Sequence, residues 1–253
     1  PAATEADFLF EKTYVCPVCD QEFHSKKIRT GKVKLLAADT DLRPKYQYVD
    51  CLKYDAVACP YCGYAALDRF FKFMMPAQAR LIREHISANF KGLPATDSIY
   101  TYDDALERHQ LALLNTVIKK AKESERAYTC LKMAWICRGK AESLSEELPN
   151  YKIQLKELKQ QEKELLENAY TGFETAFSKE SFPMCGMDEI TVSYLLAELA
   201  RRIGKFEESS RWISRVLISR DANDRIKNRA REIKELLNKD MHKAVSYTHL
   251  RAH

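Results

Sequence analysis

Two short stretches with matching spacing decide how the first part of this chain folds: residues 14–20 read YVCPVCD, and residues 58–64 read ACPYCGY. Each holds two cysteines separated by two residues, a spacing that lets one tight turn direct both sulfurs at a single ion. The residue after each pair, Asp20 or Gly63, is of a type that tolerates a left-handed backbone. Two such turns supply the tetrahedral four-thiolate shell of structural zinc sites. The sequence therefore predicts a Zn2+ site made by Cys16, Cys19, Cys59 and Cys62.

A closed shell of four thiolates leaves no position for water or substrate, so the predicted ion is structural rather than catalytic. The 39 residues between the two turns exceed the roughly 15 to 20 of a compact zinc ribbon, which indicates inserted β-structure. Redox dithiols or buried thiols without metal are the alternative interpretation, although a redox motif usually occurs once. His24 and Cys51 lie close to the motifs in sequence, and we expect both to be bystanders.

The composition is that of a folded protein, because 45% of the 253 residues are hydrophobic. The 41 basic residues slightly outnumber the 36 acidic ones, which permits an acidic partner without requiring one. Cysteines in metal-type pairs favour a reducing cytoplasm, and no apolar run approaches the roughly 20 residues that span a bilayer. We expect a cytoplasmic protein with no membrane segment. Because the chain starts at Pro1, a missing leader remains an alternative.

Residues 8–67 alternate β-branched and aromatic residues with turn signals, which predicts a small β-rich, zinc-ribbon-like domain. We expect strands within 32–36 and 46–58. Beyond this domain the apolar residues recur at helical spacing, so residues 68–98 are interpreted as connecting helices that end in a linker at 92–98.

Residues 99–240 carry the apolar periodicity of consecutive helices, which makes the whole chain an α+β fold that is mainly α. The expected helices are 102–122, 126–140, 151–178, 188–203, 206–219 and 222–238.

Residues 191–221 resemble one tetratricopeptide repeat in helix spacing, turn position and small-residue placement. Ala197 and Ser209 would let its two helices approach closely. A weaker second copy would pair residues 127–134 with 169–177. We therefore predict a tetratricopeptide-like helical array, and the alternative is a bundle without repeats.

Residues 241–253 form a tail in which the helical pattern breaks at Val245. This stretch is similar to translated adapter sequence, so we do not interpret it as native. Its histidines would then form no metal site.

Three further cysteines and two surface segments have plain structural interpretations. Cys130 and Cys137 share one helix face and are expected in the core, whereas Cys185 lies in a loop where reactivity is easier to imagine. Residues 201–234 contain 11 basic and 5 acidic residues, and we interpret them as a solvated helical face. The Phe- and Met-rich segment 70–75 is expected to join the ribbon to the helices.

With these motifs in place, the chain resembles the bacterial domain-of-unknown-function family 2225 over nearly its whole length except the tail. The first cysteine turn has Asp20 where the family usually has glycine. The resemblance implies a zinc-ribbon-like N-terminus and a tetratricopeptide-like remainder, and it implies no activity. It rests on residues 16–19 with Phe23, the basic run 26–29, the Asp39-Thr40-Asp41 segment with Tyr46, and Tyr54-Asp55 leading into residues 59–65.

Our leading functional hypothesis is a non-enzymatic adaptor whose helical array binds a protein or peptide partner. A second hypothesis is nucleic-acid binding by the ribbon, and a thiol- or metal-dependent enzyme is the third. The second hypothesis assigns phosphate contacts to Lys26, Lys27, Arg29, Lys32 and Lys34.

Overall fold

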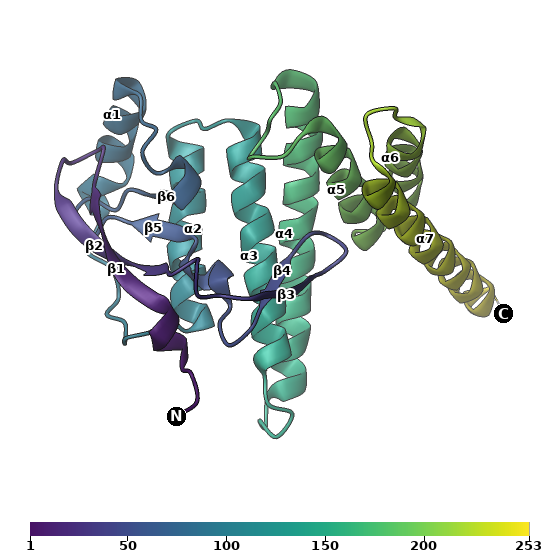
Figure 1. Ribbon diagram of the computed structural model, residues 1–253, viewed down its shortest axis with the longest axis horizontal. Coiled ribbons are helices and arrows are strands. Elements are labelled where there is room, and N and C mark those ends of the chain that lie inside the picture. Colours follow the sequence, from purple (N-terminus) through teal and green to yellow (C-terminus); the bar gives the residue numbers. More distant parts are fainter. Residues whose placement is uncertain (253) are drawn as a thin grey trace.

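The computed structural model describes residues 1–252 and shows an α+β fold that is mainly helical, as predicted (Figure 1). The strands lie in the N-terminal quarter and form three separate antiparallel hairpins. The pairs are β1 (Leu9–Val15) with β2 (Glu22–Ile28), β3 (Leu35–Ala38) with β4 (Pro44–Tyr46), and β5 (Ala56–Ala58) with β6 (Ala65–Leu67).

The helices follow the strands in chain order, and α2, α3 and α4 stand side by side at the centre of the molecule (Figure 1). Side-chain caps define several helix starts: Thr101 accepts from the Asp104 amide at 3.0 Å, and Asp188 accepts from the Thr191 amide at 2.8 Å. The bounds are α1 Pro76–His85, α2 Tyr102–Ile118, α3 Glu123–Ser143, α4 Tyr151–Lys179, α5 Glu189–Arg202, α6 Phe206–Ile218 and α7 Asp224–Arg251.

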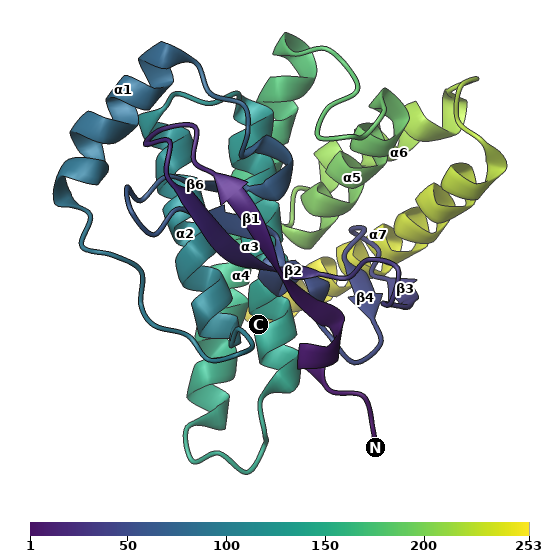
Figure 2. The same cartoon turned by 60° about the vertical axis from the view of Figure 1, so that its left-hand side comes forward.

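Helix α2 joins the strand-bearing part to the other helices. Ala112 on α2 packs against Ala58 and Ala65 of the β5–β6 hairpin, and small side chains there let the helix lie close to the strands. Asn115 donates from Nδ2 to the carbonyl of Gly63 at 3.1 Å. Helix α2 also lies beside α3 and packs against it, so α2 contacts both parts of the chain (Figure 2).

The helix pairs pack through small residues, as the repeat-like pattern predicts. Ser209 on α6 donates to the carbonyl of Ala197 on α5 at 2.8 Å, and both residues are buried. Between α3 and α4, a Cβ atom at Gly172 would lie 2.8 Å from the Cβ of Ala127, so only glycine permits this approach. Of the expected helices, 151–178, 188–203 and 206–219 match α4, α5 and α6 within one residue at each end.

Two sequence-based expectations about the strands were wrong. Residues 46–58 do not form one strand, because Asp50 accepts a hydrogen bond from the Leu52 amide and starts a 3-10 turn at Cys51–Tyr54. The predicted strand 32–36 overlaps β3 only at its last two residues. The β1–β2 hairpin was missed, since its exposed charged residues obscure the alternation of buried Phe23 and Ser25.

Two expectations about helix limits also need correction. The first α-helix begins at Pro76 and not near residue 67, because proline is favoured at the first helical position and residues 68–70 form only a 3-10 turn. The tail does not break the helix at Val245: α7 continues to Arg251. Residues 241–252 are exposed, so only local hydrogen bonding holds this last part of α7.

A buried histidine on α2 makes the stability of this fold sensitive to pH. His109 is fully buried, its Nδ1 lies 2.7 Å from the Ala105 carbonyl oxygen, and its Nε2 has no partner among residues 1–252. Burial lowers the pKa of His109 to about 4, with Asp55 and Lys132 as the charged groups nearby. The neutral imidazole is therefore the form that the folded protein contains near neutral pH.

We predict that the free energy of unfolding falls as the pH drops from about 6.5 toward about 4, by up to about 1.4 kcal/mol per unit. The reason is that His109 binds a proton in the unfolded chain over this pH range, whereas it stays neutral in the folded protein. Urea unfolding at about pH 7.5 and about pH 5 measures the effect. His109→Leu should lose less stability than the wild type over this interval, and an equal loss in both proteins would contradict the prediction.

Candidate metal centre and the buried ion network

The two cysteine turns meet, and their four sulfurs form one cluster. The ligand atoms of Cys16, Cys19, Cys59 and Cys62 all lie within 4.8 Å of one another. The Cys16 and Cys62 sulfurs are 3.5 Å apart, and the Cys19 and Cys59 sulfurs are 3.7 Å apart. Four sulfurs at about 2.3 Å from a tetrahedral ion would be about 3.8 Å from one another. The cluster is therefore a fitting site for a metal ion with four thiolate ligands.

Each turn has the same local hydrogen bonds. The Asp20 amide donates to the Cys16 carbonyl at 2.9 Å, and the Gly63 amide donates to the Cys59 carbonyl at 3.2 Å. Asp20 and Gly63 have φ of 60° and 80°, the left-handed values that their positions predict. A Cβ at Gly63 would also lie 2.8 Å from the Phe90 ring, so glycine is needed at this turn for space as well.

An aromatic cluster and helix α1 hold the two turns in place. Tyr64 is fully buried, contacts the ring of Phe71 and donates its hydroxyl to the Phe71 carbonyl at 2.8 Å. After α1, Ser87 donates to the Cys62 carbonyl at 2.7 Å, and Arg83 donates to the Val18 carbonyl at 3.2 Å. Since α1 and the turn that follows it bond both cysteine turns, the sulfurs are positioned by structure outside the two motifs.

The protonation of the sulfurs follows from their closeness. Hydrogen bonds with Cys16 and Cys62 lower the pKa of Cys59. The contact with Cys59 raises the pKa of Cys16, and the contacts with Cys16 and Cys59 raise the pKa of Cys62. Close sulfurs thus favour one thiolate and hold protons on the others. A divalent cation bound here would take the place of these protons, because metal ligation requires thiolates.

The remaining cysteines and His24 lie outside this cluster. His24 is exposed, with Nδ1 3.1 Å from the Thr13 hydroxyl, and Cys51 packs beside the buried Phe8 and Ile28. Cys130 and Cys137 are core residues of the helices, as expected. Cys185 is less reactive than its loop position suggested, because burial raises the pKa of its thiol to about 12.

The five basic residues of the nucleic-acid hypothesis do not form one free stripe. Lys26 pairs with Glu11, Lys27 pairs with Asp68, and Arg29 donates to the Leu9 carbonyl at 3.1 Å. Lys32 and Lys34 are exposed.

Residues 9–237 match the family described as an uncharacterized protein conserved in bacteria (DUF2225). The chain belongs to this family. The match covers the metal site and the helices up to α7 but not the tail, in agreement with the extent of the resemblance described above. No curated protein and no solved structure matches the chain significantly. Within residues 1–252, none of the helices is both long enough and apolar enough to cross a membrane.

A second polar centre, which sequence reasoning missed, lies where the β3–β4 hairpin reaches the helices. Figure 1 shows this hairpin crossing in front of α3 and α4 toward α5. The loop between its strands, residues 39–43, carries two aspartates and an arginine into the interior. Asp41 is completely buried and Arg43 nearly so.

Two residues of α3 bind Asp41. Arg138 donates to both Asp41 oxygens, at 2.8 and 2.7 Å, and the Trp135 indole nitrogen donates to the carboxylate at 3.0 Å. Burial alone would raise the pKa of Asp41, but these donors and the charge of Arg202 lower it. Arg138 also binds Glu162 of α4 at 2.7 Å, so one guanidinium connects the loop with two helices.

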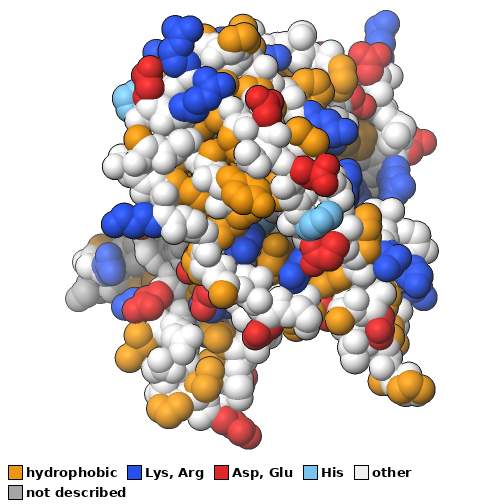
Figure 3. All heavy atoms as spheres, turned by 90° about the vertical axis from the view of Figure 1, so that its left-hand side faces the viewer, with side chains coloured by type: hydrophobic (Ala, Val, Ile, Leu, Met, Phe, Trp, Pro, Cys, Tyr) orange, Lys and Arg blue, Asp and Glu red, His pale blue; other side chains and the backbone are white. Residues whose placement is uncertain are grey.

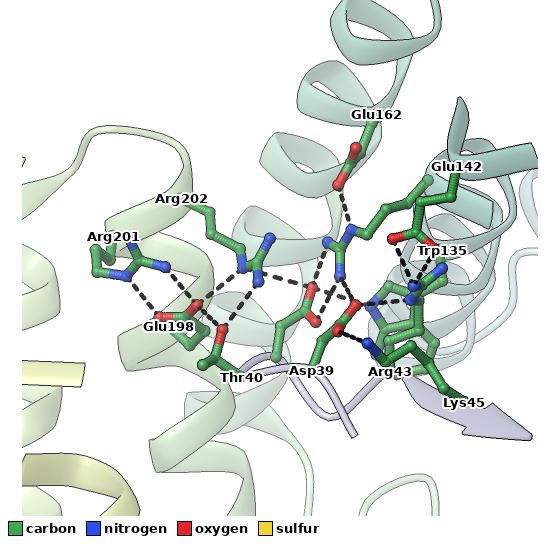
Figure 4. Close-up of polar contacts among 12 residues, drawn as sticks. Asp39, Thr40, Arg43, Lys45, Trp135, Glu142, Glu162, Glu198, Arg201 and Arg202 are labelled. Atoms are coloured by element: carbon green, nitrogen blue, oxygen red, sulfur yellow. Dashed lines mark hydrogen bonds and ion pairs between the residues drawn. The ribbon is translucent and has the colours of Figure 1, made fainter. Parts of the chain in front are cut away.

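The neighbouring residue Thr40 contacts α5 in the same network (Figure 4). Its hydroxyl lies 2.5 Å from the fully buried Glu198 carboxylate and accepts from Arg202 at 2.9 Å. The Tyr194 hydroxyl donates to the Thr40 carbonyl at 2.6 Å. The loop therefore lies against both α3 and α5. Every side chain of its Asp-Thr-Asp sequence forms a hydrogen bond with a helix residue.

The sequence offered one signal for this network, the Asp39-Thr40-Asp41 segment that contributes to the family resemblance. Its role could not be predicted, because the arginine partners lie about 100 and 160 residues away in the chain. Leu42 adds a structural cost: its φ of 73° is unusual for a branched side chain, and it packs against both helical cores.

We predict that Cys62→Ser lowers metal content well below one equivalent and unfolds the N-terminal part, because about 10–16 kcal/mol of apparent binding free energy is coupled to folding. Elemental analysis and thermal unfolding measure both effects. Cys51→Ser is the matched control, since this cysteine lies outside the cluster. A full equivalent of metal in Cys62→Ser would contradict the assignment.

We predict that Arg138→Met lowers the free energy of unfolding by about 3–5 kcal/mol, because it leaves the buried Asp41 carboxylate without its main partner. Arg215→Met should change it by less than about 0.5 kcal/mol, since Arg215 is half-exposed in its pair with Glu189. Urea denaturation measures both. Combining Arg138→Met with Asp41→Asn should recover part of the loss, and strict additivity of the two single changes would show that the pair is not coupled.

Proposed function

We propose that the protein is a zinc-binding, non-enzymatic adaptor whose partner is a protein or peptide. One observation supports this most directly. The buried 39–43 loop fixes the strand-bearing part, which contains the four cysteines, to the helices. The strands, the four-cysteine cluster and helices α2 to α5 are thereby packed together and present one mixed surface. Such a surface suits recognition of a partner better than chemistry on a small substrate.

Zinc is the ion that the donor set favours. Four thiolates in a closed tetrahedral shell suit zinc, which takes Zn–S distances of about 2.3 Å and has no redox chemistry of its own. The eight cysteines are all free of disulfides, which supports a reducing, cytoplasmic setting.

The reactive groups offer little support for an enzyme. Burial raises the pKa of Cys51 and of Cys185 to about 12, so both are thiols near neutral pH and poor nucleophiles. A four-sulfur shell also leaves no open coordination position at the metal.

The position of the 39–43 loop changes where a partner could bind. The loop bonds Trp135 of α3 and Tyr194 of α5, so it covers the part of the helical array where these residues lie. We therefore place the partner on the outer surface of the combined body.

Affinity capture with the full chain from a bacterial lysate, with and without a zinc chelator, tests the proposed function. We expect a reproducible set of proteins whose capture depends on zinc and survives nuclease treatment. Capture of nucleic acid alone would favour the second hypothesis and contradict this one, and so would the absence of any enriched protein.

A further inference from the structure

A groove of about 560 Å³ lies beside the metal unit, between the start of α1 and the turn that joins α2 to α3. One wall comes from segment 70–75, which was expected to join the ribbon to the helices. The other wall comes from the turn between α2 and α3. Its apolar lining includes Phe70, Phe73, Met74, Met75 and Ala121.

The apolar wall is only partly explained by the core. Phe70 and Met74 pack against the cluster around the metal site, whereas Phe73 is 75% exposed and Met75 is 64% exposed. Two large apolar side chains exposed on the same groove are unusual for a surface that faces only water. Methionine is also a flexible side chain that adapts to different apolar partners.

Three of the polar side chains that line the groove, those of Lys119, Ser124 and Glu125, are already bonded within the protein. Lys119 donates to Glu125 at 2.7 Å, and the Ser124 hydroxyl donates to Glu180 at 2.5 Å. An apolar side chain can therefore enter the groove without leaving a buried charge unpaired, which would otherwise oppose binding.

The segments that form the rims of the groove carry a net positive charge. Residues 68–84 contain four basic and two acidic residues, and residues 119–126 also contain four basic and two acidic residues. The first turn of α1 lies at the groove and has no acidic side chain to offset the positive end of the helix dipole. Figure 3 shows one face of the molecule, where hydrophobic side chains are exposed among both basic and acidic side chains.

We infer that this groove binds an acidic amphipathic helix, whose apolar face covers Phe73 and Met75 while its carboxylates meet Lys122. Charge complementarity selects the sign of the partner, and a groove lined by flexible methionines suits a helix with anchors at i, i+3, i+4 and i+7. The inference rests on the proposed adaptor function and adds the chemistry of the partner.

Fluorescence anisotropy with a labelled synthetic peptide tests it, using leucine at i, i+3, i+4 and i+7 and glutamate elsewhere. We expect binding that weakens with salt and a loss of at least about tenfold in affinity for Phe73→Asp and Met75→Asp. Ile218→Asp is the matched control, because Ile218 is 80% exposed on the distant α6 and should not affect binding. Metal content and circular dichroism confirm that each variant is folded.

The inference is overturned if the intact protein does not bind the peptide, if Phe73→Asp binds it equally well, or if a lysine-for-glutamate peptide binds as tightly. Self-association that Phe73→Asp abolishes would identify a second copy as the occupant and would also overturn it. If Phe73→Asp leaves lysate capture unchanged, the adaptor function stands and only the groove assignment fails. If the wild type captures no protein, the adaptor function itself fails.

Discussion

The ion pair between Asp41 and Arg138 is the contact on which the arrangement of this molecule depends. It lies at the tip of a hairpin that starts in the metal-bearing part and ends between helices, so it joins regions nearly 100 residues apart. Replacing such a buried pair by apolar residues is often neutral for stability, because desolvation offsets most of the attraction. We therefore interpret its main effect as orientation: only one placement of the loop satisfies Asp41, Trp135 and Arg138 together.

The four-cysteine cluster and the buried ion network both hold the strand-bearing part in place, at two different points. About 60 residues of short strands cannot bury enough apolar surface to be stable alone, and the sulfur cluster supplies local cross-linking. The cluster does not, however, orient the strands relative to the helices. Asn115, Arg138 and Arg202 do so by bonding the strand-bearing part from α2, α3 and α5. A surface made by the strand-bearing part and the helices together needs both kinds of contact. The proposed partner groove lies between segment 70–75 with the start of α1 and the turn that joins α2 to α3.

The sequence predicted the features that depend on local spacing and missed those that depend on distant partners. The four cysteines and the α5–α6 pair could be found because two-residue spacing and 3.6-residue periodicity are visible within short windows. The role of Asp41 was invisible, since nothing near it in the chain indicates Arg138. The expected end of the helical pattern at Val245 was wrong for the opposite reason: α7 continues by local hydrogen bonding alone, where no core pattern is needed.

The difference between local spacing and distant contacts also explains why the exposure of segment 70–75 was not predicted. Its Phe and Met residues were interpreted as a seam because large apolar side chains are usually buried, and Phe71 is indeed buried beside the metal site. Because α1 begins only at Pro76, the preceding residues 71–75 lack helical spacing, and Phe73 and Met75 do not reach that core. Their exposure is thus a consequence of where one helix begins. Phe71 holds one end of this segment in the core beside the cysteines, and the start of α1 at Pro76 holds the other end. Phe73 and Met75 lie between these two points and cannot turn inward, so water or a partner must cover them.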